Sequence, residues 1–525
     1  MRKVSTNSTS SSGPVGGPAL EGQVVASGPL NKLHPANVMT RMNDALMNFM
    51  RLSAGRLVPL SVRKNCSLIL LVVLAGCSGN SAGPGLAPDT VAFLDTLQRK
   101  TFNFFWDLTP ASNGLTPDRW PTPSFSSIAA VGFALTAYPI GVEHSWITRA
   151  QAADRTLATL RFFWTSPQDS ASPNTTGYRG FYYHFLDMTT GRRFQTVELS
   201  TIDTSLLLGG ILFAQSYFTG SDTTEKEIRA LADSIYFRVD WQWAQARPPA
   251  VSMGWHPETG FINADWIGYN EGMILNILAL GSPTHPADST TWNKWVSGYQ
   301  WGTYHGESFV QFAPLFGHEY SHVWIDFRGI KDAYMQGRGI DYFENSRRAT
   351  LSQRGYGIAN PGAWRGYTSN VWGLTACDGP ANKTLTIGLR SREFHTYTAR
   401  GAALGDERDD GTLCTTAVGG AVPFAPEFTI PALLAMRTTY GDKLFSTYGF
   451  LDAFNPTFTA SGQQEVGTVD PTLGWFDVDY LGIDQGPILA MVENYRTDLV
   501  WRVMRTNPHI IRGLKRAGFT GGWLP

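Results

Sequence analysis

Apolar residues recur at intervals of three and four along most of this chain, the spacing that places them on one face of an α-helix. Long connections rich in glycine, tryptophan and proline separate these stretches, and strand-like alternation is sparse. About ten to twelve helices joined alternately by short turns and long aromatic loops predict an all-α fold, an (α/α) toroid whose function lies in the loops at one end. A helical solenoid is the alternative, weakened because no repeat of fixed period occurs. The helical stretches are residues 90–106, 125–138, 145–164, 201–218, 225–244, 270–280, 341–359, 426–440 and 484–506.

The last of these stretches has the clearest pattern. Its apolar residues follow one another at steps of four, three, four and four, which predicts one continuous helix over 484–506. Asp484 stands where an N-cap is expected, and Asn270 takes the same place before the helix predicted at 270–280. The apolar stripe consists of Ile488, Val492, Tyr495, Leu499 and Val503.

The beginning of the chain resembles an export leader. Arg63 and Lys64 precede a short apolar run, too short to span a bilayer comfortably, that ends in Leu74-Ala-Gly-Cys77. Small residues directly before a cysteine resemble a bacterial lipobox, which makes Cys77 the lipidated first residue of the mature protein; a cleaved ordinary signal with a chance cysteine is the alternative. We therefore expect an N-terminal extension and signal peptide over 1–76, a flexible tether over 77–88, and one domain over 89–525. The protein is then a periplasmic or outer-membrane-anchored lipoprotein of a Gram-negative bacterium.

Charge and composition narrow the function. The 525 residues include 42 Lys+Arg and 43 Asp+Glu, a net charge of -1 without a basic run, which excludes a strongly phosphate-neutralising surface for nucleic acid. Aromatic residues make up 13% of the chain and charged residues only 16%. So many flat apolar side chains suit a carbohydrate-binding groove, because sugar C–H faces stack on aromatic rings.

One short motif points to a different chemistry. His318-Glu319-Tyr-Ser-His322 matches H-E-x-x-H, which on a helix places two imidazoles on one face for zinc, with the glutamate as general base. Glu344 follows as a conceivable third ligand. The flanking segments leave only a short helix, and nothing else in the chain is peptidase-like. A packed segment whose histidines face sugar or core is the favoured interpretation.

Acidic residues repeatedly stand beside aromatic ones at the predicted mouths of helices. Sugar recognition needs this combination: carboxylates bind hydroxyl pairs, rings stack on pyranose faces, and two further carboxyls can perform hydrolysis. The blocks are Glu198-Leu-Ser-Thr-Ile-Asp203, Trp255 to Trp266, Gly268-Tyr-Asn-Glu271, His318 to Arg328, Trp372 to Asp378, Asp409-Asp410-Gly-Thr, Val422 to Glu427, Gly474-Trp-Phe-Asp477 and Gly482-Ile-Asp484-Gln-Gly-Pro.

In this order, these blocks resemble the glucoamylase-like family of bacterial proteins, and most closely glycoside hydrolase family 144, whose members cleave β-1,2-glucan. The resemblance covers about residues 89–525. It implies a single (α/α)6 barrel, an inverting mechanism, and neither a catalytic metal nor a cofactor. Glu319 departs from the family, where we expect glutamine, and this departure creates the zinc-like match.

An inverting glycosidase needs a protonated acid and an ionised base about 6.5–9.5 Å apart, so the two carboxyls must come from different loops. Related (α/α)6 hydrolases imply Glu271 as the acid and Asp484 as the base. The positive end of a helix dipole favours the ionised form of Asp484. It works against Glu271, whose pKa must be raised by burial or by a neighbour such as Asp203. Asp203 is also the strongest substitute for either role.

A wider set of residues is predicted to bind substrate. Some carry an alternative interpretation: each aromatic residue alone is more often core, Asp326 with Arg328 can be a buried ion pair, and Asp410 suits a turn. The set consists of Trp255, Trp266, Tyr269, Asn270, His318, Tyr320, Trp324, Asp326, Arg328, Trp372, Asp378 and Asp410.

Cys377 and Cys414 stand 37 positions apart in a compartment that permits oxidation, which predicts a disulfide, with two buried thiols as the alternative. The favoured function is an inverting hydrolase of β-1,2-glucan or its oligosaccharides, endo-acting or an exo-acting relative. We expect a monomer that touches the membrane only through its lipid anchor. A zinc peptidase using His318, Glu319 and His322, and a non-catalytic glycan-binding lipoprotein, are the alternatives.

Overall fold

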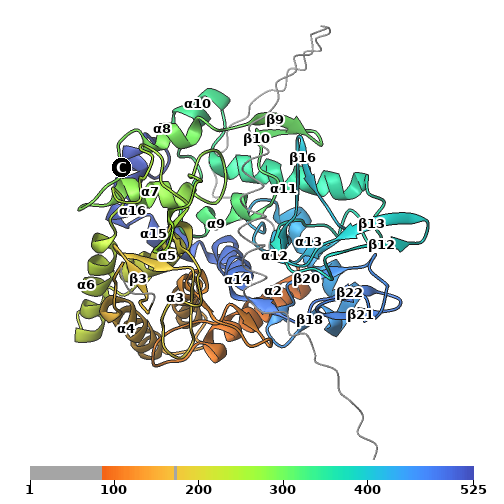
Figure 1. The fold of residues 1–525 in the computed structure, drawn as a ribbon, viewed down its shortest axis with the longest axis horizontal. Coiled ribbons are helices and arrows are strands. Elements are labelled where there is room, and N and C mark those ends of the chain that lie inside the picture. Colours follow the sequence, from red (N-terminus) through yellow and green to blue (C-terminus); the bar gives the residue numbers. More distant parts are fainter. Residues whose placement is uncertain (1–85, 171–173) are drawn as a thin grey trace, which may run out of the picture.

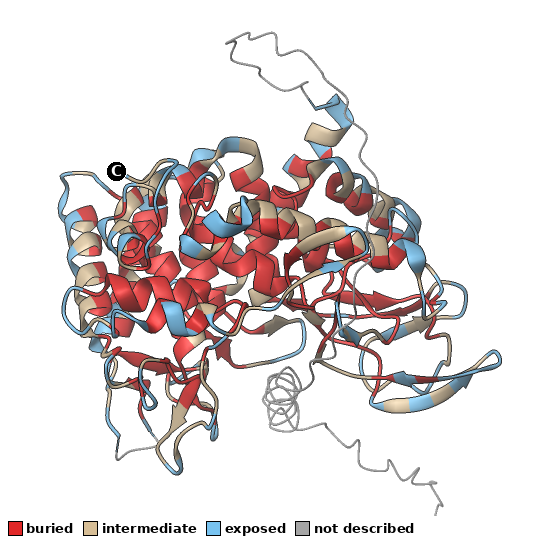
Figure 2. Cartoon of the chain, turned by 90° about the horizontal axis from the view of Figure 1, so that it is seen from above, coloured by how far each residue is buried: buried red, intermediate tan, exposed pale blue. Residues whose placement is uncertain are grey.

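Two layers of helices form the body of the protein in a computed structural model that describes residues 86–170 and 174–525 (Figure 1). Six helices are buried almost throughout and form the inner layer, and six others bury one face against them (Figure 2). The predicted (α/α)6 toroid is confirmed. The inner helices are α3 (Ile128–Glu143), α5 (Thr201–Tyr217), α7 (Met273–Gly281), α9 (Phe316–Trp324), α12 (Thr416–Gly419) and α14 (Gly482–Thr497). The outer helices are α2 (Pro88–Leu108), α4 (Arg149–Thr165), α6 (Thr223–Arg238), α11 (Tyr342–Ala359), α13 (Pro426–Tyr440) and α16 (Pro508–Arg516).

The inner helices α3 and α5 pack unusually close to each other. A Cβ atom on Gly210 would lie 2.0 Å from the carbonyl oxygen of Gly132, and one on Gly132 would lie 2.3 Å from that of Leu206. Such contacts are impossible for any larger residue, so glycine at these two positions permits the close approach of the two backbones. Three short helices complete the described chain: α8 (Thr291–Val296), α10 (Ala333–Arg338) and α15 (Leu499–Met504).

The last predicted helix is wrong in one respect. Asp498 adopts a left-handed conformation with φ 60°, which ends α14 and separates it from α15. The apolar stripe therefore continues over two helices instead of one. The predicted caps are also wrong, because Leu481 is the N-cap of α14 and Gly272 that of α7, while Asp484 is the third residue of its helix.

Strands are more frequent than the sequence indicated, although nearly all are short. They lie at the mouth of the toroid, where two-residue strands lead directly into inner helices: β2 (Ser126–Ser127) into α3, β6 (Leu199–Ser200) into α5 and β23 (Tyr480–Leu481) into α14. Antiparallel pairing fixes the position of each helix start. A five-stranded sheet has the order β3-β4-β6-β7-β8, with β3 (Gly177–Tyr178), β4 (Phe181–Tyr183), β7 (Gly254–His256) and β8 (Gly260–Phe261).

The other strands form a second sheet and several two-stranded ribbons. The second sheet has the order β17-β20-β22-β21, with β17 (Leu413–Cys414), β20 (Ala453–Asn455), β22 (Gly474–Phe476) and β21 (Thr468–Asp470). The ribbons pair β1 (Arg119–Trp120) with β23, β5 (Phe185–Leu186) with β2, β9 (Trp301–Tyr304) with β10 (Glu307–Val310), β11 (Ala376–Cys377) with β14 (Thr398–Ala399), β12 (Lys383–Ile387) with β13 (Arg390–Phe394), β15 (Gly401–Ala403) with β16 (Asp406–Arg408), and β18 (Phe445–Ser446) with β19 (Gly449–Phe450).

Within 86–170 and 174–525, no helix is both long enough and apolar enough to cross a membrane. Cys77 and the predicted leader and tether lie outside the described residues, apart from the last three tether positions.

Candidate active site

A cavity of about 280 Å³ opens at the mouth of the toroid, between the five-stranded sheet and the starts of α5, α7 and α14. Its wall combines carboxyl groups with aromatic and aliphatic side chains, the mixture expected for a site that binds a polar molecule with apolar faces. The lining residues are His184, Glu198, Ser200, Ile202, Asp203, Leu206, Met253, His256, Ile262, Trp266, Glu271, Phe316, Tyr320, Ala376, Tyr397, Ala399 and Ile483.

On one side of this cavity lies a group that we call the His184 cluster: His184, Glu198, Asp203 and Glu271. The imidazole of His184 lies between two carboxyl groups, with Nδ1 2.8 Å from Glu198 Oε1 and Nε2 3.5 Å from Asp203 Oδ2. Burial opposes the charge on the ring, but Asp203 and Glu198 outweigh it and raise the pKa of His184 to about 9. Burial raises the pKa of Asp203, and His184 and the Ser200 hydroxyl, which donates to Asp203 at 2.5 Å, oppose this rise.

Glu271 is the carboxyl group of this cluster that favours the protonated form. It lies two residues before α7, not in its first turn as the sequence indicated, and its carbonyl oxygen accepts a hydrogen bond of 3.0 Å from the hydroxyl of Ser321. Its Oε2 atom is buried without a hydrogen-bond partner. Burial, and to a lesser extent the charge of Asp203, raises the pKa of Glu271 to about 8. Of the two causes that the sequence left open, burial is therefore the larger.

Asp484 lies in the first turn of α14, where the sequence predicts an ionised carboxylate. The structure shows that burial outweighs the helix dipole and raises the pKa of Asp484 to about 8. Its Oδ1 atom accepts a hydrogen bond of 3.5 Å from the hydroxyl of Tyr320, which lines the cavity, and Oδ2 is buried without a partner. Asp452 lowers the pKa of Asp484, whereas burial and the charge of Asp484 raise the pKa of Asp452 well above its ordinary value. These opposite directions favour ionisation of Asp484 before Asp452.

Asp484 belongs to a second group, which we call the Arg119 cluster. Its members are Arg119, Asp118, Asp378, Asp452, Asp477, Asp479 and Asp484. The guanidinium of Arg119 contacts Asp378 at 2.6 Å, Asp118 at 3.2 Å and Asp479 at 3.7 Å. Burial raises the pKa of Asp477 well above its ordinary value despite this cation. Within the described part of the chain, Asp378, Asp477 and Asp479 are the one group of three carboxylates close enough to share a metal ion. Arg119 already supplies a fixed positive charge there, so we assign no metal.

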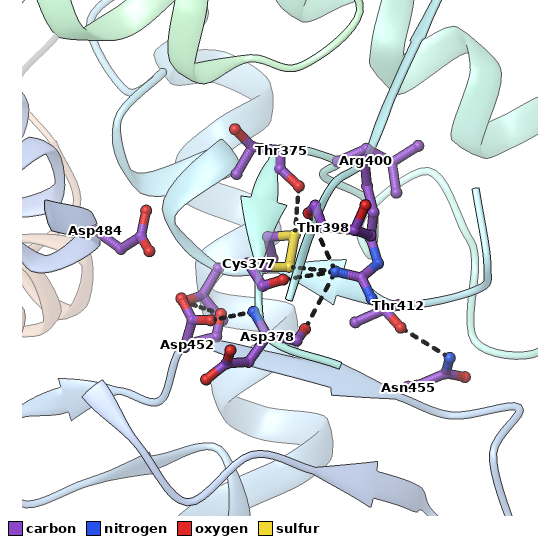
Figure 3. The surroundings of a disulfide bond; sticks show 12 residues. Thr375, Cys377, Asp378, Thr398, Arg400, Thr412, Asp452, Asn455 and Asp484 are labelled. Atoms are coloured by element: carbon purple, nitrogen blue, oxygen red, sulfur yellow. Dashed lines mark hydrogen bonds between the residues drawn. A yellow bond between two sulfur atoms is a disulfide. The ribbon is translucent and has the colours of Figure 1, made fainter. Parts of the chain in front are cut away.

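A disulfide joins Cys377 and Cys414 beside this cluster (Figure 3). It connects β11 to β17, and Asp378 follows Cys377 directly. The backbone N–H of Asp378 donates to Asp452 at 2.7 Å, which fixes the two carboxyl groups relative to each other. Arg400, on the other side of the disulfide from Asp484 in Figure 3, donates to the carbonyl oxygen of Cys377 at 2.7 Å.

Comparison with known proteins gives one consistent result. Residues 263–508 match the Glycoamylase family model, which describes glucoamylase-like proteins. Over these residues the chain is therefore similar to glucoamylase-like proteins. An exo β-1,2-glucooligosaccharide sophorohydrolase (non-reducing end) of Parabacteroides distasonis is 28% identical over 81% of this chain, and the chain spans 57% of that relative's length.

Solved structures of similar proteins share the same fold. An endo-β-1,2-glucanase from Chitinophaga pinensis, solved with sophorotriose and glucose, is 26% identical with a TM-score of 0.70, over 83% of this chain and all of the other. A β-1,2-glucanase from Parabacteroides distasonis is 27% identical with a TM-score of 0.69, over 82% of this chain and 60% of the other.

The structure places the predicted substrate residues in several different surroundings. Trp266 and Tyr320 line the cavity together with Asp203 and Glu271, while Asp378 lies in the Arg119 cluster. Trp255 lies near the cavity but outside its lining, half-buried with its ring 5.4 Å from that of Tyr178.

Three predicted subsite walls belong instead to the hydrophobic core. Trp324 is fully buried, stacks on Phe133 and donates to Thr136, so it has no face for a sugar. Tyr269 and Trp372 are likewise buried and line no part of the cavity. These predictions fail because a tryptophan or tyrosine in a loop block looks the same in sequence whether its ring faces the core or the cavity.

Four polar residues of the predicted set have structural contacts. The side chain of Asn270 accepts from the N–H of Gly272, and Asp410 holds Arg400 through two hydrogen bonds of 2.7 and 2.8 Å. Asp326 and Arg328 pair with each other at 2.7 Å, and Arg328 also binds Asp498 at the C-terminal end of α14, the opposite end from Asp484.

The H-E-x-x-H segment lies on α9, and all three of its polar side chains are fully buried. His318 Nε2 donates to the carbonyl oxygen of Phe312 at 3.2 Å, and His322 Nε2 lies 3.1 Å from the hydroxyl of Ser346. Both carboxyl oxygens of Glu319 lack a hydrogen-bond partner, and burial raises its pKa well above the ordinary value. The two histidines are thus bound to groups other than a common metal, and the segment is part of the core.

Several functional residues were absent from the sequence prediction. His184, Arg119, Asp452, Asp479 and Tyr397 come from short strands and loops with no recognisable pattern. Glu198 begins one of the acidic-aromatic blocks, of which the sequence pointed to Asp203 alone. Glu198 and Asp479 each stand directly before a two-residue strand that leads into an inner helix, β6 into α5 and β23 into α14, a signal that is visible only once the helices are placed.

Proposed function

We propose that this protein is an inverting glycoside hydrolase that cleaves β-1,2-linked glucan or its oligosaccharides, with Glu271 as the general acid. The observation that carries the proposal is the buried Glu271 carboxyl, which has a free Oε2 in the wall of the cavity and a pKa of about 8. Such a group is protonated at neutral pH and can give its proton to the glycosidic oxygen of the leaving sugar.

Asp484 is the matching general base. The pKa of Asp484, about 8, lies below the strongly raised pKa of Asp452, so Asp484 is the carboxyl of the two that ionises first. Near pH 8, where Asp484 is partly ionised and Glu271 partly protonated, Asp484 can accept a proton from the attacking water. The hydroxyl of Tyr320 joins Asp484 to the cavity. Water then attacks the anomeric carbon as its bond to the leaving oxygen breaks, Glu271 protonates that oxygen, and Asp484 receives the proton of the water.

The relatives support the substrate class. The sophorohydrolase acts on β-1,2-glucooligosaccharides, and the Chitinophaga enzyme is an endo-β-1,2-glucanase. The similarity to them extends over 81% and 83% of this chain, respectively. The two relatives differ in exo and endo action, so the length of the products decides which of them this protein resembles in action.

The test is to incubate the purified protein with α-1,4-, β-1,3- and β-1,2-glucans and to analyse the products by size. We expect short products from β-1,2-glucan alone, with inverted anomeric configuration in proton NMR during the first turnovers. Retention of configuration would contradict the base role of Asp484. Binding of β-1,2-glucan without any product would favour the non-catalytic glycan-binding alternative.

Two substitutions test the catalytic pair. In E271Q and D484N the rate should fall by about 10²- to 10⁴-fold, the usual contribution of a general acid or base. E344Q is the matched control, because Glu344 pairs with Arg348 on the outer helix α11 and should leave the rate unchanged. Turnover like that of the wild type in either variant would remove that residue from the pair.

We also propose that the protein is an exported lipoprotein anchored through Cys77, and a monomer. Leu74-Ala-Gly-Cys77 supports the first statement, and Cys77 lies outside the described residues. Expression of the full chain in a Gram-negative host with labelled palmitate should give a labelled, membrane-bound protein, and C77S should be neither labelled nor sedimented with membranes. The sedimentation behaviour of a protein that consists of residues 89–525 tests whether this domain is a monomer in solution.

A further inference from the structure

The imidazole of His184 is held in one orientation by its surroundings. His184 connects β4 to β5; its N–H donates to the carbonyl oxygen of Glu198 at 3.0 Å, and its own carbonyl oxygen accepts from Ile128 at 3.3 Å. The ring stacks on Phe185, with 3.8 Å between the centroids. The side chain therefore presents both nitrogens to fixed neighbours, and one edge of it lines the cavity.

Both ring nitrogens face carboxylate oxygens. A neutral imidazole has one N–H donor and one acceptor, and an ionised carboxylate can only accept, so a neutral ring would satisfy one of the two neighbours and face the other with a lone pair. Only the imidazolium form donates to Glu198 and at the same time presents a positively charged N–H to Asp203, whose Oδ2 lies 3.5 Å from Nε2. The two carboxylates are themselves buried, at 7% and 4% exposure, and need a cation to remain ionised.

We propose that His184 is a positioning residue that remains protonated during catalysis and keeps Glu198 and Asp203 ionised as hydrogen-bond acceptors in the cavity wall. Ionised carboxylates accept from sugar hydroxyls, whereas a protonated carboxyl offers one donor and fewer acceptor positions. His184 thus acts on the substrate through its two neighbours. This inference rests on the proposed function, since it assigns Glu198 and Asp203 to the binding of the sugar.

The charges around His184 are consistent with this role. Besides Glu198 and Asp203, the carboxyl of Asp118 also acts on the ring, and Asp118 is itself paired with Arg119 at 3.2 Å. On the far side of Glu198 lies His256, whose pKa is lowered, chiefly by burial, so it does not compete as the cation. Arg193 lies 3.4 Å from His256, and its charge is paired with Glu258 at 2.5 Å.

The first experiment measures the charge of His184 by NMR titration of the imidazole resonances. In the wild-type protein the ring should remain protonated to about pH 9. In D203N it should lose its proton about one pH unit lower or more, because an opposite charge has been removed. A ring that is neutral at pH 7 in the wild-type protein would overturn the inference. This titration needs no substrate, so it decides the charge even if the protein does not cleave β-1,2-glucan.

The second experiment measures kcat/KM for β-1,2-glucan against pH in H184Q. Without the imidazolium, Glu198 and Asp203 ionise at higher pH, so we expect a loss of about tenfold near pH 5 that shrinks to about threefold near pH 8. The loss should lie mainly in KM, because the two carboxylates bind the substrate. A merely structural role would reduce kcat/KM by the same factor at every pH, and that result would overturn the inference.

H144Q is the matched control. His144 also stacks on an aromatic ring, that of Trp146, and its Nε2 lies 2.7 Å from a buried carboxylate, Glu493, but it lies outside the cavity. Its variant should keep the pH profile of the wild-type protein. A pH-dependent loss of the same size in H144Q would show that the effect in H184Q does not come from the cavity. If wild-type protein gives no product, the proposed function fails, while the NMR titration still decides whether His184 is a cation.

Discussion

The His184 cluster and the Arg119 cluster meet at the mouth of one toroid, but they balance their negative charge differently. In the His184 cluster one imidazole lies between two carboxyl groups at 2.8 and 3.5 Å. In the Arg119 cluster one guanidinium faces a larger group of buried acids, and burial raises the pKa of Asp452 and Asp477 far above the ordinary value. A cluster with too few cations must therefore retain protons, as the strongly raised pKa values of Asp452 and Asp477 illustrate.

This difference separates two kinds of acidic site. Where one cation contacts each of two carboxylates, both can remain ionised in a buried wall and accept hydrogen bonds. Where carboxyl groups outnumber the cation, they form a proton store whose members ionise one after another. An inverting hydrolase needs both: fixed acceptors to hold the sugar, and a pair of groups whose proton affinities differ.

The largest effect is expected from R119Q, which removes the guanidinium that pairs with Asp118, Asp378 and Asp479. Loss of one partner of a buried ion pair costs about 3–5 kcal/mol of folding free energy. The penalty should shrink as pH falls, because protonated carboxyl groups no longer repel one another. Urea unfolding at several pH values measures it. A penalty that grows toward acidic pH would contradict the idea of a proton store.

A second prediction concerns the disulfide, which borders the Arg119 cluster alone. In the double variant C377A/C414A the free energy of unfolding should fall by about 2–4 kcal/mol, since the cross-link no longer restricts the unfolded chain. The NMR titration of His184 should be unchanged. Thermal unfolding of the oxidised and variant proteins, each with this titration, provides the measurement. A shifted His184 titration would show that the two clusters are coupled through the disulfide.

The smallest effect is expected from D203N on the pH dependence of catalysis. Asp203 raises the pKa of Glu271 by its charge, so neutralising it should lower that pKa and move the basic limb of the rate profile to lower pH. The shift should be below about one pH unit, because burial is the larger cause. A pH–rate profile of kcat measures it. A shift to higher pH would show that Asp203 does not act on Glu271 through its charge.

The helical layers were predictable because their signal is local. The predicted stretch 426–440 coincides with α13, and 341–359 differs from α11 by one residue, since amphipathic spacing depends only on neighbours along the chain. The break at Asp498 was not predictable, because the apolar stripe continues across it. The short strands were missed for a related reason, since two residues carry no recognisable alternation.

From the sequence alone, Asp203, Glu271 and Asp484 were predicted as catalytic residues, and Trp266 and Tyr320 as substrate-binding residues. In the structure all of these except Asp484 line the cavity, and Asp484 is hydrogen-bonded to Tyr320. It missed His184, because this residue belongs to no recognisable sequence pattern. Only the fold brings its imidazole to 3.5 Å from the carboxylate of Asp203. It also placed Trp324 and Asp326 in the site, although one packs against Phe133 in the core and the other lies toward the far end of α14.

By itself, the sequence determined the resemblance to glucoamylase-like proteins, the helical architecture and the supply of carboxyl groups beside aromatic rings, because these follow from residue types and their spacing. Only the tertiary structure decided which carboxyl groups are charged. The proton affinity of Glu271, Asp484 or His184 depends on burial and on neighbours tens to hundreds of positions away, and folding alone brings those neighbours within a few ångströms.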